Sequence, residues 1–132
     1  MKSVEQIEFR SGLGDCFRAC VASIFEFDIE DMPNFWEETQ DGNVFWVKVN
    51  MWLIKHYSCK CLSVAVAAEY EHYVKDVLCV ANGKSPMGDE DHAVVWLNGI
   101  IHDPHPLRVG IKGLPDTFTF FMPLRIDFLR NS

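Results

Sequence analysis

The apolar residues of this chain follow a helical period in its first half and a strand period in its second half. From residue 16 to residue 25 they recur at every fourth position with a paired neighbour. This spacing predicts a helix over about 15–26, with Asp15 as its N-cap. Residues 28–31 are expected to form a short helical turn that Pro33 limits. A second helical pattern predicts a helix near 43–57, with an apolar face formed by Val44, Trp46, Val47, Met51, Leu53 and Ile54. Helices followed by strands predict an α+β fold, with N-terminal helices packed on a C-terminal antiparallel β-sheet.

Short apolar runs bounded by turn residues predict strands after residue 58. The expected strands are 59–66, 76–81, 92–97, 100–103, 117–122 and a further one at 125–128. Asn98–Gly99 is a strong signal for a tight hairpin between the third and fourth of these. In this hairpin Leu97 faces Ile100. Asp103 then becomes a diagonal neighbour of His92, so the two side chains are expected to meet.

Length and composition limit the classes of protein to which this chain can belong. With 132 residues, of which 48% are hydrophobic, the chain is expected to form one domain over 1–132 and not to be disordered. A net charge of −7 argues against nucleic acid as the partner, because binding to phosphates needs a basic face. The sequence contains no apolar run of membrane-spanning length and no apolar segment typical of a signal peptide near residue 1. We therefore expect no membrane partner and a cytoplasmic location.

The five cysteines are expected to be reduced, because their number is odd and no export signal precedes them. Most are expected to be buried as small apolar residues. Cys59 and Cys61 share one face of a strand, and His102, Asp103 and His105 cluster at a strand end, so both groups raise the question of a metal. Neither has a second ligand pair at zinc spacing, and we expect no metal and no cofactor.

Cys16 differs from the other cysteines because it is expected in the first turn of a helix. A helix N-terminus favours the thiolate, and an imidazolium from His92 favours it further. A carboxylate such as Asp103 on the other ring nitrogen fixes the orientation of the imidazole. The backbone N–H of Cys16 is also placed to bind an oxyanion. Together these residue types indicate nucleophilic catalysis by a cysteine.

Each of these residues also has a purely structural interpretation. A cysteine on an apolar helix face is usually core, and Asp103 before Pro104 is a common turn element. The glycine-bounded segment 83–88 lacks the strand and helix context of a phosphate-binding loop. We interpret it as a mobile loop before His92 that is able to cover a cleft.

Three segments resemble papain-like cysteine peptidases. They are GDCFRACVASIF at 14–25, HAVVW at 92–96 and HDPHP at 102–106. The resemblance is strongest to the compact bacteriocin-processing type, and to small phage-encoded proteins of that fold that also carry a segment like MPNF at 32–35. It implies a papain-like fold with Cys16 as nucleophile, His92 as general base and acid, and Asp103 as the orienting carboxylate.

The same resemblance implies that Gln6 is an oxyanion donor. Gln6 lies ten residues before Cys16, where the peptidase pattern has about six, so a structural role for Gln6 stays open. The implied activity is hydrolysis of a peptide, isopeptide or related amide through a thioester on Cys16, by a phage-encoded protein acting on a peptide or protein substrate in the host cytoplasm. Acyl transfer to an amine is a variant of this chemistry. The alternative is a non-catalytic phage protein of the same fold that binds or inhibits a host factor.

Overall fold

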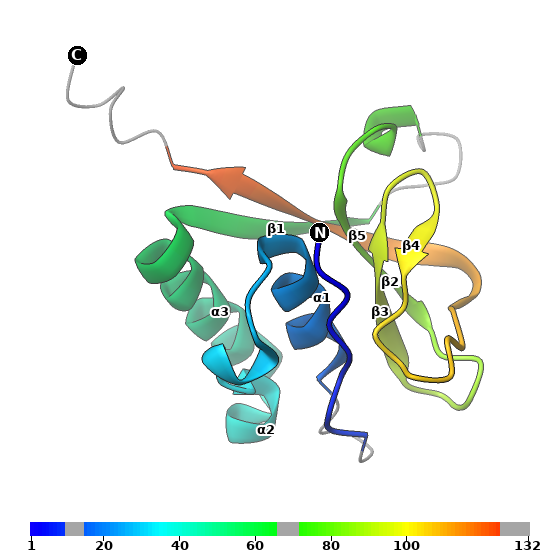
Figure 1. Cartoon of the computed structure of the whole chain (residues 1–132), viewed down its shortest axis with the longest axis horizontal. Helices are drawn as coiled ribbons and strands as arrows, with labels where there is room; N and C mark the ends of the chain where they lie inside the picture. The colour runs from blue at the N-terminus through cyan, green and yellow to red at the C-terminus, as the bar shows by residue number, and fades with distance from the viewer. Residues whose placement is uncertain (10–14, 66–71, 125–132) are drawn as a thin grey trace.

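Helices cover one face of a five-stranded antiparallel sheet in the computed structural model, which describes residues 1–9, 15–65 and 72–124 (Figure 1). This arrangement confirms the predicted α+β class. The helices are α1 (Cys16–Phe25), the 3-10 helix η1 (Ile29–Asp31), α2 (Phe35–Thr39) and α3 (Gly42–Tyr57). The strands are β1 (Cys59–Ala65), β2 (Cys79–Lys84), β3 (Asp91–Trp96), β4 (Ile100–His102) and β5 (Lys112–Pro123).

Helix α1 occupies almost the predicted range and packs against β3. Asp15 stands at the predicted N-cap position, but its side chain makes no capping hydrogen bond. The carboxylate instead accepts the backbone N–H groups of Ile7 and Glu8, each at 3.1 Å from Oδ1. Asp15 thereby ties the N-terminal segment to the start of α1, because buried acceptors take whichever donors lie closest.

Helix α3 confirms the second predicted helix. Asp41 caps it, with its Oδ1 accepting the N–H groups of Asn43 at 3.0 Å and Val44 at 3.2 Å. Val49 and Leu53 are fully buried beneath β1, at the i, i+4 spacing of one helix face. The expected apolar face was partly wrong, because several of its residues are exposed. These are Val44, Val47, Met51 and Ile54.

The short helix α2 was not expected from the sequence. Asn34 caps it by accepting the N–H of Glu37 at 3.3 Å. The helix holds Trp36 against Phe45 of α3, with ring centroids 5.8 Å apart. The predicted helical turn after Asp28 is η1, which ends at Asp31 before Pro33.

The sheet has the order β1-β5-β2-β3-β4, so the last strand along the chain lies between the first two. Strand β2 begins and ends three residues later than predicted and runs through Asn82 and Gly83. Gly83 therefore does not form a turn. A side chain there would lie 3.3 Å from Ile111, so glycine serves a close approach between neighbouring segments.

The predicted hairpin is formed by β3 and β4, but the pairing of Leu97 with Ile100 was wrong. Trp96 pairs with Ile100, which leaves a three-residue loop with Asn98 at φ 57° and Gly99 at φ 136°. An irregularity follows, and Val95 pairs with His102. The predicted register also places Val95 opposite His102, so this second pair agrees with the prediction. The residues after β4 therefore still lie beside the start of β3.

Apolar side chains pack on both faces of the sheet. Cys20 of α1 meets Val80, Ala93 and Val95 on the helix side. The opposite face carries Val94 and Phe118 among other buried residues, and Val74 and Val77 cover it. In Figure 1 this covering segment lies above the sheet and the helices lie below it.

Two predicted strand segments fall partly or wholly outside the described residues. Val66, the expected end of the first strand, and the expected strand at 125–128 both lie there. Within 1–9, 15–65 and 72–124, no helix has the length and apolar character needed to cross a bilayer.

Truncation of the α3 core residue tests the packing of α3 on β1. We expect Leu53→Ala to lower the free energy of unfolding by about 2–5 kcal/mol, because Leu53 is fully buried and a cavity would remain. The matched control is Met51→Ala on the same helix, which is 65% exposed and should change stability by less than about 0.5 kcal/mol. Urea denaturation followed by circular dichroism measures both. Equal effects would contradict the described orientation of α3.

Candidate functional site

His92 and Asp103 form a buried pair at the site. His92 is the second residue of β3, and Asp103 follows the last residue of β4. The Nε2 atom of His92 lies 2.7 Å from Oδ1 of Asp103, and both side chains are less than a tenth exposed. The hairpin thus brings together the two residues that the sequence predicted to meet.

The carboxylate of Asp103 is held by several donors at once. Its Oδ1 also accepts the backbone N–H of His105 at 2.9 Å, and its Oδ2 accepts the N–H of Gly110. Arg108 donates to the Asp103 carbonyl at 2.6 Å and closes the loop around the pair. Burial opposes ionisation, but the hydrogen bonds from His92, His105 and Gly110 outweigh it and lower the pKa of Asp103.

Neither Arg108 nor Gly110 was singled out from the sequence. Arg108 has a positive φ of 51° and also forms an ion pair with Glu5, at 2.7 Å. Gly110 also has a positive φ, of 73°, a conformation that suits glycine. No sequence motif marks these contacts, since they depend on how the loop after β4 folds back.

Cys16 is the third member of the group. It begins α1 and is half-buried, and its side chain lies close enough to His92 to favour the charged form of that imidazole. Because Nε2 of His92 is engaged by Asp103, Nδ1 is the ring nitrogen left for the sulfur. Burial alone would lower the pKa of His92, but the hydrogen bond with Asp103 and the nearby Cys16 outweigh it and raise the pKa to about 9. An imidazolium at neutral pH is therefore the form expected beside Cys16.

The other four cysteines are buried and unlike Cys16. Burial raises the pKa of the Cys61 thiol to about 12 and that of Cys79 to about 11. It also raises the pKa of Cys59, and it raises that of Cys20 well above the ordinary value. These thiols stay protonated near neutral pH and behave as small apolar core residues.

Gln6 lies close to this group, as the resemblance implied. Its backbone N–H donates to the carbonyl of Pro104 at 3.0 Å, which ties the N-terminal segment to the loop after β4. The side-chain Nε2 donates to the carbonyl of Glu8 at 3.2 Å. The side-chain Oε1 is buried and has no hydrogen-bond partner in the described part of the chain. An amide has two N–H donors, so a second one remains for a ligand.

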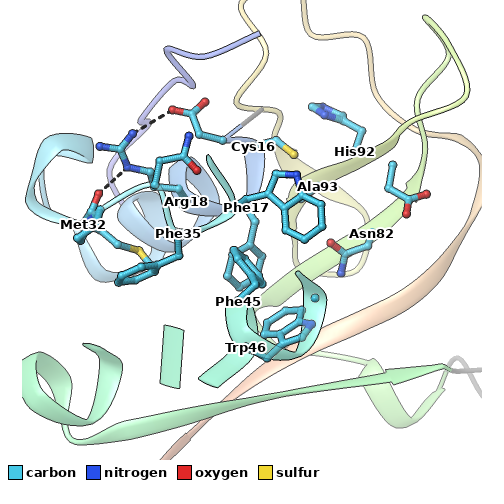
Figure 2. Close-up of a pocket in the computed structure, with 16 residues that line it drawn as sticks. Cys16, Phe17, Arg18, Met32, Phe35, Phe45, Trp46, Asn82, His92 and Ala93 are labelled. Carbon is cyan, nitrogen blue, oxygen red and sulfur yellow. Dashed lines mark hydrogen bonds and ion pairs between the residues drawn. The ribbon is translucent and has the colours of Figure 1, made fainter. Parts of the chain in front are cut away.

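Two cavities meet at Cys16 and His92. The first, of about 260 Å³, extends toward α2 and α3 and is mainly aromatic (Figure 2). The second, of about 530 Å³, is bounded by Gln6, Phe9, His105 and the loop between β2 and β3. Cys16, Asp91 and His92 line both. The loop expected to lie near a cleft, here 85–90, is therefore a wall of the second cavity.

The two histidines of the HDPHP segment, His102 and His105, take different positions. His102 is buried, and its Nε2 lies 2.7 Å from the carbonyl oxygen of Val4, so it supports the N-terminal segment and not the Cys16 group. The ring of His105 lies edge-on to that of His92, with centroids 6.3 Å apart, and also packs against Phe9. His105 is thus part of the cavity wall.

The metal alternatives raised by the sequence gain no geometric support. In the described ranges, no three His, Cys, Asp or Glu side chains are grouped so that they could hold a metal ion. Cys59 and Cys61 both face the core between β1 and α3.

Comparison with known proteins assigns no function to the site. No protein-family model, curated protein or solved structure matches this chain.

Removal of the Asp103 carboxylate tests the electrostatics of the pair. In the native protein we expect His92 to titrate at about 9, and in Asp103→Asn to titrate closer to its ordinary 6.5, because the amide no longer favours the imidazolium. Because the folded pKa is the higher one, the stability contributed by this histidine is complete below about pH 6.5 and is lost as pH rises through about 9.

Proton NMR of the imidazole C–H resonances measures this titration. Asp28→Asn is the matched control, because Asp28 is an exposed carboxylate paired with Lys2 at 2.7 Å. It should leave the His92 titration unchanged. A native pKa near 6.5 would contradict the described pair.

Thiol labelling tests the difference between the cysteines. At pH 7, iodoacetamide should modify Cys16 before any of the other four, because Cys16 is half-buried beside an imidazolium and the others are buried. His92→Ala should slow the labelling of Cys16. Mass spectrometry of peptides from the labelled protein gives the order, and uniform labelling of all five would contradict the described geometry.

Proposed function

We propose that this protein is a cysteine hydrolase that cleaves a peptide, isopeptide or related amide bond through a thioester on Cys16. The observation that carries the proposal is the position of Cys16 beside His92, which is hydrogen-bonded to Asp103, at the junction of two cavities. A thiol, an imidazole and a carboxylate in series are the groups that nucleophilic acyl transfer requires. Most of the Asp103 and His92 surface is buried, which keeps the ring in one orientation.

The proposed reaction has two halves. The sulfur of Cys16, whose proton has passed to His92, attacks the amide carbon, and the C=O electron pair moves onto oxygen. When this intermediate collapses, the C–N bond breaks and His92 gives its proton to the departing nitrogen. Water then loses a proton to His92, its oxygen bonds to the thioester carbon, and the C–S bond breaks to release the acid and restore the thiol. Asp103 remains ionised throughout and stabilises the imidazolium.

The negative oxygen formed in both halves needs donors. The backbone N–H of Cys16 lies in the first turn of α1, where N–H groups have no partner within the helix. The second N–H of the Gln6 amide is the other proposed donor, since Gln6 lines the same cavity as Cys16. Gln6 thus serves the site directly and, through its backbone bond to Pro104, also holds the N-terminal segment in place.

The proposal extends to the fold family and the setting. The proposed fold family is that of the papain-like cysteine peptidases, and it is supported by a helix that begins at the cysteine and packs on the strand that carries the histidine. The proposed source is a phage, and the proposed place of action is the host cytoplasm, on a peptide or protein substrate.

Peptide cleavage tests the proposed activity. We expect the native protein to cut members of a synthetic peptide mixture, which labelling of new amino termini and mass spectrometry detect. Cys16→Ala should abolish the cuts because no nucleophile remains. His92→Ala should lower the rate by at least about 100-fold, because general acid–base catalysis is lost.

Two controls make this experiment decisive. Cys79→Ala removes a buried thiol outside the site and should keep the same cuts if the protein remains folded by circular dichroism. Added hydroxylamine should divert part of the product from acid to hydroxamate if a thioester forms. Cuts that persist in Cys16→Ala, or a native protein that produces none, would contradict the proposal and favour the non-catalytic binding protein.

A further inference from the structure

The first cavity has a mainly apolar wall beside the nucleophile. Its aromatic residues come from α1, α2 and α3 and are Phe17, Phe35, Trp36, Phe45 and Trp46. Edge-to-face contacts lock these rings together, such as the one between Phe17 and Trp46, with centroids 5.2 Å apart. Figure 2 shows the rings extending away from the Cys16 sulfur, with Met32 at one end and Asn82 on the opposite wall. The cavity is therefore a formed pocket and not a gap between mobile side chains.

The charged groups in this wall have partners within the protein. Asp91 pairs with Lys84 at 3.0 Å. Arg18 donates from Nε to the carbonyl of Met32 at 2.6 Å and from Nη1 to Asp15 at 3.3 Å, as the dashed lines in Figure 2 show. An internal partner on the guanidinium removes the main electrostatic reason for an anion to bind there. The pocket consequently offers contact area for an apolar group.

The size and position of the pocket restrict its occupant. At about 260 Å³ it lies just below the usual range of about 300–1,000 Å³ for small-molecule sites, which suits one large side chain. It opens at Cys16 and His92, so an occupant is attached close to the reacting bond. The second cavity carries two further acidic residues, Asp89 and Glu90, besides Asp91, which lines both cavities. An apolar group gains more by entering the first cavity.

We propose that the aromatic pocket selects substrates with a large apolar side chain next to the amide that Cys16 attacks. This inference rests on the proposed function and names the specificity of the same site. The pocket residues act by removing apolar surface from water, which contributes roughly 25 cal/mol per Å² buried. Small or charged groups at this position lose that contribution.

Two chloroacetamides that differ only in their nitrogen substituent test the inference. In both, the Cys16 sulfur, whose proton has already passed to His92, bonds to the methylene carbon as chloride leaves. The rate for N-(2-phenylethyl)chloroacetamide is divided by that for N-methylchloroacetamide, and the same ratio for free glutathione gives the chemical baseline. We expect the Cys16 ratio to exceed the baseline by at least about tenfold, as an apolar pocket discriminates by that order.

Gly42→Leu blocks the pocket without a clash. Gly42 begins α3 and lines the pocket, and an added Cβ would meet no atom within 4 Å. This variant should bring the ratio down toward the glutathione baseline. The matched control is Val47→Leu on the same helix, which is 59% exposed and outside the pocket, and it should keep the native ratio.

The outcomes separate this inference from the proposed function. A native ratio equal to that of glutathione, or a ratio that Gly42→Leu and Val47→Leu leave alike, overturns the aromatic pocket as a specificity site while Cys16 remains a reactive nucleophile. If neither chloroacetamide modifies Cys16 faster than the buried cysteines, the proposed hydrolase itself is overturned, and its specificity with it.

Discussion

The buried carboxylate of Asp103 is the group on which the arrangement of the site depends. A carboxylate removed from water is costly unless donors surround it, and here three donors come from three places in the chain. They are the ring of His92 on β3, the N–H of His105 in the loop after β4, and the N–H of Gly110 before β5. One ionised group therefore fixes both the histidine orientation and the path of the loop that forms the cavity wall.

A second buried carboxylate, Asp15, holds the N-terminal segment in place by accepting its hydrogen bonds, as Asp103 holds the loop after β4. It accepts the N–H groups of Ile7 and Glu8, and burial raises its pKa even though these bonds and Arg18 oppose the shift. Gln6 lies immediately before these two residues and is held from the other side by Pro104. The segment that carries Gln6 is thus anchored to the helix of the nucleophile and to the loop of the Asp103 pair.

Periodicity and turn chemistry predicted the fold class, α1, α3 and the hairpin, because these features depend on neighbours in the sequence. The meeting of His92 with Asp103 followed from the hairpin register, although the register near Trp96 and Ile100 was wrong by one residue and recovered at Val95 and His102. What failed depended on tertiary contacts. Gly83 signals a turn locally, yet Ile111 approaches it within the sheet, and Asp15 signals a cap, yet other donors reach it first. The sequence left the aromatic residues open between core and cleft wall, because periodicity does not distinguish rings that line a pocket from rings that fill a core.

The contrast between Cys16 and the remaining cysteines argues that its position has a chemical consequence. A thiol on an apolar helix face normally packs inward, as Cys20 does one turn later on α1, where burial raises its pKa. Cys16 instead lies at the end of the helix, beside a histidine whose pKa is raised by its own hydrogen bonds. A core cysteine needs no charged neighbour, whereas a nucleophilic cysteine needs an imidazole next to its sulfur. The place of Cys16 at the helix start beside His92 meets that need, and the places of the four buried cysteines do not.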